Sequence, residues 1–328
     1  MTMNLKKLMI SVAVCAFGFS GIAEAKTFRF GHGQPAGHPR DQAAQFFAKR
    51  VDELSKGEMK ITVGASSSFG DDVEMITALR LGTLDFSANS QGPLAAAVPE
   101  VAMIGLPFLF KDAPTAWKVL DGPVGDELAK LTEAKKMVLL ANWCNGIRHI
   151  TNNVRPIKTV DDIKGLKIRT TPSDAVVLDI FEAVGANPTP VKFSELYLAL
   201  QQGVIDGQEN PFANIYASKF HEVQKYLSVS GHKYEHTPLL ISGVTWGKLS
   251  DEEKKIIRQA ADESRDFQRE VSSKSDLEYK QKIADYGVEI IDLERQGFVD
   301  ITKPVYEKWK KVHPEFVELI SKAAQEAN

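Results

Sequence analysis

One short pattern occurs twice in this chain, 121 residues apart, and it restricts the possible folds more than any other feature. Residues 78–85 read Ala-Leu-Arg-Leu-Gly-Thr-Leu-Asp, and residues 199–206 read Ala-Leu-Gln-Gln-Gly-Val-Ile-Asp. The same offset places Asn89 on Asn210. Each copy reads as a helix that a glycine stops, then a short strand and a loop. A unit used twice predicts two similar lobes, each with a loop asparagine at the carboxyl end of a strand. Chance similarity is the alternative.

Residues 26–63, which follow the N-terminal segment, predict a parallel sheet. Residues 27–30 and 59–63 alternate as strands, and residues 40–55 carry apolar side chains at helical spacing. Strand, helix, strand is a βαβ unit, so the fold class is α/β. The turn-rich loop 31–39 follows the first strand and therefore lies at the edge where open α/β sheets bind ligands. It contains His32 and Gln34.

A long helix is predicted from Ser250 to about Asp285. Ser250 and Glu253 form a capping box, and the helical pattern continues without proline or glycine. At roughly 1.5 Å per residue this helix is roughly 50 Å long, which exceeds one small lobe. It must lie across both lobes or project from them.

The N-terminus is typical of an export signal. Lys6 and Lys7 precede the apolar run 8–19, which is too short to span a bilayer, and residues 23–25 form a small-x-small cleavage site. We therefore predict a signal peptide over residues 1–25 and a secreted or periplasmic protein. The remaining chain holds one cysteine, Cys144, and no second run of membrane-spanning length.

Composition and motifs exclude several classes of function. The formal net charge is −3 and no basic block stands out, so nucleic acid is not an expected partner. His232 and His236 are predicted to share one strand face but to lie too far apart to chelate together. No catalytic nucleophile motif is present. We expect no metal and no cofactor.

Arg169 is the candidate ligand-binding residue with the best chemistry. It ends the predicted strand 166–170, and its planar guanidinium fits both oxygens of a carboxylate. The alternative is a solvated charge on an edge strand. Other polar residues near predicted strand ends are Arg148, Asn89, Asn210, Glu74, His32 and Gln34. The set suits a hydroxylated anion that is bound and released unchanged. Phe212 and Trp143 could pack against its apolar face, with plain core as the alternative, which we favour for Trp143.

The chain resembles the DctP-type solute-binding proteins of TRAP transporters. The motifs are Asn-Gly-Ile-Arg at 145–148, Gly-Leu-Lys-Ile-Arg at 165–169, Phe-Ser-Glu-Leu-Tyr-Leu-Ala-Leu-Gln-Gln-Gly at 193–203 and Asp-Gly-Gln-Glu-Asn-Pro at 206–211. The resemblance implies the two-lobed periplasmic binding protein fold, crossing strands as a hinge and a long helix spanning both lobes. We expect lobe I to comprise 26–148 and about 237–280, and lobe II 149–236 and about 281–328.

The resemblance also implies roles for single residues. Arg169 would hold a ligand carboxylate in a bidentate pair, assisted by Arg148 and Asn210, and the loaded protein, expected to be a monomer, would deliver its small organic acid to sodium-driven TRAP membrane permease subunits. Sialic-acid-binding relatives carry an acidic residue where this chain has Ser90. The polar loop 31–39 favours a sugar acid, either a uronate or an aldonate, over a C4-dicarboxylate, which stays the alternative. A sensor subunit, or an enzyme with Glu74 or His236 as base, is also open. The predicted ligand-binding residues are Arg169, Arg148, Asn210, Glu74, His32, Gln34, Asn89, Ser90, Asn145, Phe212 and His236.

Overall fold

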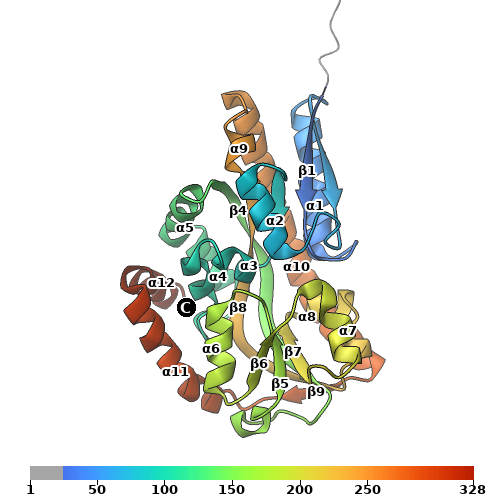
Figure 1. Cartoon of the computed structure of the whole chain (residues 1–328), viewed down its shortest axis with the longest axis vertical. Helices are drawn as coiled ribbons and strands as arrows, with labels where there is room; N and C mark the ends of the chain where they lie inside the picture. Colours follow the sequence, from blue (N-terminus) through green and yellow to red (C-terminus); the bar gives the residue numbers. More distant parts are fainter. Residues whose placement is uncertain (1–24) are drawn as a thin grey trace, which may run out of the picture.

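A computed structural model describes residues 25–328, which form one nine-stranded sheet with helices packed on both faces (Figure 1). The strand order is β2-β1-β3-β8-β4-β7-β5-β6, and β9 pairs with β8. The predicted signal peptide lies outside the described residues, apart from its last residue. The strands are β1 (Lys26–Gly31), β2 (Met59–Gly64), β3 (Phe86–Ala88), β4 (Met137–Asn152), β5 (Lys167–Thr170), β6 (Asn187–Pro190), β7 (Gly207–Asn210), β8 (Tyr226–Ser242) and β9 (Glu289–Asp292).

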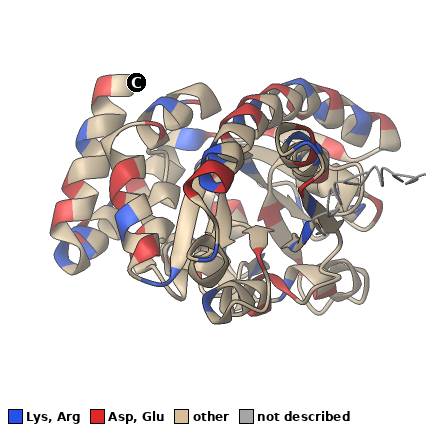
Figure 2. Ribbon diagram, turned by 90° about the horizontal axis from the view of Figure 1, so that it is seen from above, with Lys and Arg blue, Asp and Glu red and all other residues tan. Residues whose placement is uncertain are grey.

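The helices surround this sheet, and none of those described is long and apolar enough to cross a membrane. Figure 2 shows that positive and negative residues are both distributed over the helices. The α-helices are α1 (Pro39–Leu54), α2 (Asp72–Leu81), α3 (Gln91–Ala95), α4 (Ala113–Leu120), α5 (Pro123–Glu133), α6 (Ala175–Ala183), α7 (Leu196–Gln201), α8 (Phe212–Ala217), α9 (Gly243–Trp246), α10 (Asp251–Tyr286), α11 (Arg295–Val312) and α12 (Pro314–Ala327).

Two long antiparallel strands, β4 and β8, connect the two halves of the sheet. The parallel group β2-β1-β3 joins the carboxyl half of β8, and the parallel group β6-β5-β7 joins the carboxyl half of β4. The predicted α/β fold with two lobes is confirmed. The Asn-Gly pair at 145–146, which by itself predicts a turn, forms none, because a bulge there lets β4 continue, with φ of +131° at Gly146.

The repeated sequence forms the same local structure twice. Gly82 and Gly203 both end a helix in the left-handed conformation, with φ of +75° and +69°. The Asp85 carboxylate accepts a hydrogen bond from the backbone N–H of Arg29 in β1 at 2.8 Å. In the same way, the Asp206 carboxylate accepts one from the backbone N–H of Lys167 in β5 at 2.8 Å. The strand of the second copy starts later than predicted. Residues 204–206 precede it, and the stretch 207–210 that was predicted as loop is β7.

The predicted long helix is confirmed as α10, with the Ser250 and Glu253 capping box in place. It packs along α1 through Phe46 and Phe267, whose rings stack at 4.6 Å. Further along, Tyr279 stacks on Tyr216 of α8 at 4.9 Å. The helix therefore contacts elements of both strand groups, as Figure 1 also shows.

The lobe boundaries stay a prediction. Helix α11 packs on α6, which agrees with placing residues after about 281 in lobe II. Helix α12, however, packs on α4 and α5, which the same boundaries assign to lobe I. The C-terminal segment thus contacts both predicted lobes. Trp143 belongs to the apolar core beside Phe30, as expected.

Candidate functional site

Arg169 is buried without an ionic partner. It lies on β5 and is 2% exposed. Its Nε donates to the backbone carbonyl of Val191 at 2.8 Å, and Nη1 lies 3.4 Å from Thr171 Oγ1. Among the described residues, no carboxylate makes an ion pair with it. Burial lowers the pKa of Arg169 to about 10. A buried cation with only neutral partners is costly, so this guanidinium is suited to receive an anion from outside the chain.

Arg148 differs, because two carboxylates of the protein already pair with it. Its guanidinium binds both Glu209 and Glu235, with Nη2 2.7 Å from Glu209 Oε1, and all three side chains are buried. His232 Nε2 lies 3.3 Å from Glu209. Burial alone would raise the pKa of Glu209, but the Arg148 charge outweighs it and holds this pKa well below its usual value. Arg148 therefore organises the site as part of a fixed ion cluster.

Asn210 and Asn145 lie in a chain of buried amides. Asn210 donates to Gln208 Oε1 at 2.5 Å and accepts from Asn214 Nδ2 at 2.9 Å. Asn214 Oδ1 in turn lies 2.9 Å from His38 Nε2, which comes from the start of α1. The Nδ2 of Asn145 donates to Glu235 at 2.8 Å. These contacts bring side chains from both strand groups together.

The loops after β1 and β3 present buried hydrogen-bond acceptors that have no donor among the described residues. They include Gln34 Oε1 and Asn89 Oδ1, and His32 Nδ1 is also unpartnered. Asp72 Oδ1, at the start of α2 after β2, likewise has no donor among the described residues. The other ring nitrogen of His32 lies 3.2 Å from Asp41 Oδ1. Because β1 and β3 are neighbours in the sheet, their carboxyl ends meet at one edge. A ligand that donates hydrogen bonds would satisfy these buried acceptors.

Asp72, the first residue of α2, is the buried acid of the site. A side chain at Gly33 would place its Cβ 2.7 Å from Asp72 Oδ1, so the glycine leaves the space for this carboxylate. Burial, aided by the charge of Asp71, raises the pKa of Asp72 to about 6, against the lowering effect of Arg40 and Arg169. A carboxyl in this state is a strong hydroxyl acceptor.

Ser90 and His236 border the same cluster. Ser90 Oγ lies 3.5 Å from Arg40 Nη2, at the limit of a hydrogen bond. His236 Nδ1 lies 3.0 Å from Gln91 Oε1, and burial, with a further contribution from the charge of Lys233, lowers the pKa of His236 to about 3. A histidine held neutral in this way provides no base that cycles near pH 7.

The structure does not bring two predicted residues into the cluster. Glu74 is exposed, because its carboxylate folds back to cap the Asp71 N–H and pairs with Lys192 at 3.2 Å. Its contact with the ligand stays a prediction, and Asp72, two residues earlier, is the acid of α2 that is buried beside the cluster. Phe212 is buried in an apolar cluster and stacks on His149 at 4.2 Å, so the core alternative describes it better.

Sequence reasoning missed Arg40, Asp72, Glu209 and Glu235. Arg40 carried a usable signal, since a cation in the first turn of a helix opposes the helix dipole and needs a reason. Asp72 gave no signal of a site, because an acid in the first turn of a helix is expected from the helix dipole alone. Glu209 lay in a stretch predicted as loop, where a buried ion pair is not expected.

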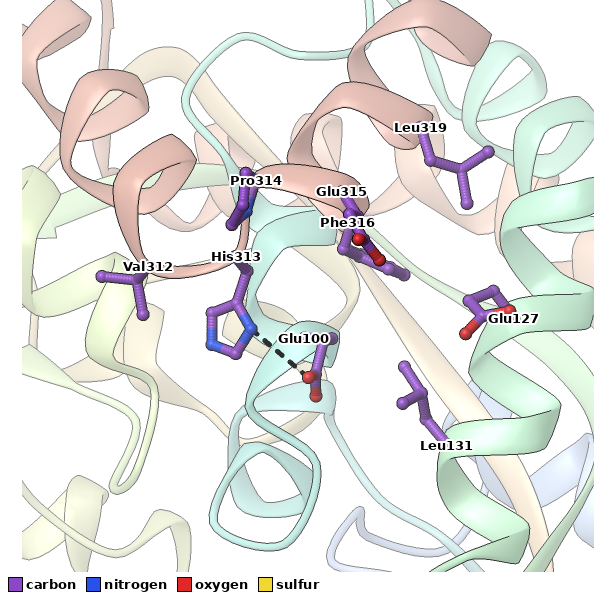
Figure 3. Close-up of a pocket in the computed structure, with 9 residues that line it drawn as sticks. All are labelled: Glu100, Glu127, Leu131, Val312, His313, Pro314, Glu315, Phe316 and Leu319. Atoms are coloured by element: carbon purple, nitrogen blue, oxygen red, sulfur yellow. Dashed lines mark ion pairs between the residues drawn. The ribbon is translucent and has the colours of Figure 1, made fainter.

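The hollows of the surface lie apart from the buried arginines. One of about 570 Å³ lies where α11 turns into α12, and Figure 3 shows its single ion pair, between His313 and Glu100 at 3.3 Å. It has no lysine or arginine to hold a carboxylate. Its lining residues are Glu100, Glu127, Leu131, Val312, His313, Pro314, Glu315, Phe316 and Leu319.

A second hollow, about 280 Å³, is lined by His38 and Asn145 and lies between α4 and α10, beside the cluster. The chemistry favours the cluster as the candidate site. No group of side chains in the described chain has the arrangement of a metal site.

The chain matches the bacterial extracellular solute-binding proteins, family 7, known as DctP, over residues 30–312. It belongs to this family, and the resemblance to TRAP solute-binding proteins is confirmed. The chain is 36% identical over 288 residues, 88% of this chain and 87% of the relative, to the 2,3-diketo-L-gulonate-binding periplasmic protein YiaO of Escherichia coli (strain K12). It is 45% identical to the uncharacterized protein y4mM of Sinorhizobium fredii over 86% of this chain, but spans only 52% of that protein.

Two solved structures have a similar fold and contain different acids. One is the sugar acid binding protein DctPAm of Advenella mimigardefordensis in complex with galactonate, with a TM-score of 0.90, 36% identity and coverage of 93% of this chain and 99% of that one. The other is a TRAP periplasmic solute binding protein of Sulfurospirillum deleyianum with bound succinate, with a TM-score of 0.87, 34% identity and coverage of 93% and 100%. The family thus includes proteins for both ligand classes considered above.

Proposed function

We propose that this protein is the solute-binding subunit of a TRAP transporter and captures a sugar acid, either an aldonate or a uronate, between its two lobes. The observation that carries the proposal is the buried Arg169, which has hydrogen bonds to Val191 and Thr171 but no counter-charge. A ligand carboxylate supplies that charge in the bidentate geometry that a guanidinium favours. The galactonate complex of a relative and the diketogulonate-binding relative support this class of ligand.

The surface opposite Arg169 favours a hydroxylated acid. Gln34, Asn89 and Asp72 each contribute an acceptor oxygen without a donor. A C4-dicarboxylate offers no hydroxyl donors there, or one in malate, and its second charge would face Asp72. Each buried acceptor left unpaired costs about 1–3 kcal/mol. The dicarboxylate stays the second candidate, because a relative with 34% identity was solved with succinate.

The experiment is a thermal-shift comparison at equal ligand concentration. D-galactonate, D-glucuronate and D-galacturonate should raise the melting temperature well above the shift given by succinate or malate. Calorimetry on the best ligand then gives its dissociation constant. If succinate or malate gives the largest shift and none of the sugar acids stabilises the protein, the dicarboxylate reading replaces this proposal.

The setting of this function is also a proposal. We infer that the protein works in the periplasm, as the family resemblance and the N-terminal segment indicate, and that it hands its ligand as a monomer to TRAP membrane permease subunits. We propose that it binds without catalysis, since the buried histidines of the site are held neutral by low pKa values. Unchanged ligand recovered after incubation and release would support this, and a new product would contradict it. A sensor role for the same ligand is tested by co-purification of a receptor in place of the permease.

A further inference from the structure

Arg40 is the second buried guanidinium of the described chain that lacks an ionic partner near the candidate site. It is 1% exposed and no carboxylate makes an ion pair with it. It lies in the first turn of α1, where the helix dipole disfavours a cation. Burial lowers its pKa to about 10, even though the charges of Asp72 and Glu235 act against this. The protein keeps a charge here at a cost, and no carboxylate of the described residues pairs with it directly.

A single nitrogen of this guanidinium, Nη2, makes all the hydrogen bonds found for it in the described structure. Nη2 donates to Asn145 Oδ1 at 3.0 Å and to Thr237 Oγ1 at 2.9 Å, and Ser90 Oγ lies at 3.5 Å. Nε is buried and has no partner, and no hydrogen bond from Nη1 is found in the described structure. Nε and Nη1 lie on the two different edges of the guanidinium, which share Nη2, so each is a free donor for a single oxygen.

Arg40 and Arg169 come from opposite strand groups. Hydrogen bonds connect Arg40 to the ion cluster of Arg148, since Arg40 Nη2 donates to Asn145 Oδ1 and Asn145 Nδ2 donates to Glu235, which pairs with Arg148. The charges of Asp72 and Glu235 raise the pKa of Arg40 and of Arg169 against the effect of burial. Arg169 comes from β5, and Arg40 comes from α1, which follows β1. The contacts of Arg40 with Asn145 and Thr237 fix its head against β4 and β8, where the two strand groups join.

The charges around the site indicate whether the ligand oxygen that accepts from Arg40 is neutral or charged. Arg148 is matched by two carboxylates, and Lys233 is matched by Asp174 at 2.7 Å. With Asp72 ionised, four cations and four carboxylates balance in this cluster. The cations are Arg40, Arg148, Arg169 and Lys233, and the carboxylates are Asp72, Asp174, Glu209 and Glu235. One ligand carboxylate adds a negative charge, which protonation of Asp72 can offset. A second carboxylate would leave an excess of negative charge in a buried site.

We propose that Arg40 is a second ligand-contacting arginine, which donates from Nε or Nη1 to a neutral oxygen at the end of the sugar acid opposite its carboxylate. The inference rests on the proposed function and deepens it. The ligand would then need a length that reaches from Arg169 to Arg40 and an oxygen, from a hydroxyl, a carbonyl or a ring, at its far end. Short hydroxy acids would satisfy Arg169 alone.

The test compares Arg40→Gln with Arg169→Gln, using D-galactonate and the three-carbon acid D-glycerate as probes in calorimetry and in competition. Arg40→Gln should weaken galactonate binding about 10- to 150-fold, the effect of one hydrogen bond to a charged group, and change glycerate binding less than threefold. Arg169→Gln should weaken both acids. The empty Arg40→Gln protein should melt at or above the wild-type temperature, because a buried unpaired charge is gone. Arg148→Gln is the matched control, and it should melt lower.

Two outcomes would overturn the role of Arg40. One is galactonate affinity within threefold of wild type in Arg40→Gln. The other is an equal loss for galactonate and glycerate together with a lower melting temperature of the empty variant, which would make Arg40 a structural residue of the hinge. Failure of the wild-type protein to bind any sugar acid is a separate result, which refutes the proposed function itself.

Discussion

Replacing Arg169 by glutamine should remove binding without destabilising the empty protein. In the complex, the variant would leave the ligand carboxylate buried without its cation, a loss of about 3–5 kcal/mol. That corresponds to a dissociation constant roughly 160 to 5000 times higher. In the empty protein the change removes a buried charge that has only the Val191 carbonyl and the Thr171 hydroxyl as partners. No ion pair of the described residues is broken.

The assay is a melting experiment with and without ligand. At about one hundred times the wild-type dissociation constant, ligand adds about 2.7 kcal/mol to the free energy of unfolding. With about 300 residues, each kcal/mol shifts the melting temperature by about 1.6 °C, so the wild-type protein should gain about 4 °C. Arg169→Gln at the same concentration should gain less than about 0.5 °C.

Arg148→Gln supplies the contrast. It leaves Glu209 and Glu235 buried and without their cation, so the empty variant should lose about 3–5 kcal/mol and melt about 5–8 °C lower. The reasoning is refuted if Arg169→Gln keeps the ligand-induced shift of about 4 °C. It is also refuted if the empty Arg169→Gln protein melts as low as Arg148→Gln, since Arg169 would then be a structural residue.

Three further predictions concern the acid of the site, pH and closure. Asp72→Asn should weaken galactonate binding yet stabilise the empty protein at pH 7 by on the order of 3 kcal/mol, because the folded pKa of Asp72, about 6, lies above its ordinary value. This gain in stability should vanish near pH 4. The control Glu74→Gln should change neither binding nor stability much. Equal effects of the two variants in calorimetry and denaturant unfolding would contradict this. In urea unfolding, the folded protein should lose stability as pH falls through about 6.5, because five buried histidines have lowered pKa values and take up protons mainly after unfolding. The five are His32, His38, His149, His232 and His236. Stability that is constant down to pH 5 would contradict this prediction. Saturating ligand should reduce the radius of gyration in solution scattering, whereas an unchanged curve with proven binding would indicate a rigid pocket.

The sequence predicted those parts of the fold that local rules decide. The capping box at Ser250, the glycine stops at Gly82 and Gly203 and the first βαβ unit all follow from residues within one or two turns of each other. The bulge at Gly146 could not be read in this way. An Asn-Gly pair is a strong turn signal, and only the partner strand β8, some ninety residues away, keeps this stretch extended.

The site was predicted in outline but not in its ionic detail. Strand-end positions pointed to Arg169 and Asn210, because ligands meet open sheets at those edges. Choosing between Glu74 and Asp72 needed the helix phase and the cap, since both acids occupy the first turn of α2 and only one turns inward. Arg148 was expected to assist with the ligand. The sequence could not show that two distant glutamates already occupy its guanidinium.

The unpaired charges give a physical reason for closure to depend on ligand. Burying Arg169 and Arg40 without an anion removes two cations from water with only neutral groups in exchange, which disfavours a closed and empty protein. In the binding mode proposed above, a sugar acid changes that balance on both sides, since its carboxylate meets Arg169 and its hydroxyls meet the acceptors at Asp72, Gln34 and Asn89. Because these groups come from opposite strand groups, they can all contact one small molecule only when the lobes approach. Ligand should therefore shift the population toward the closed form by the difference between its affinities for the two states, and Arg169→Gln should abolish that shift even at concentrations that still saturate the variant.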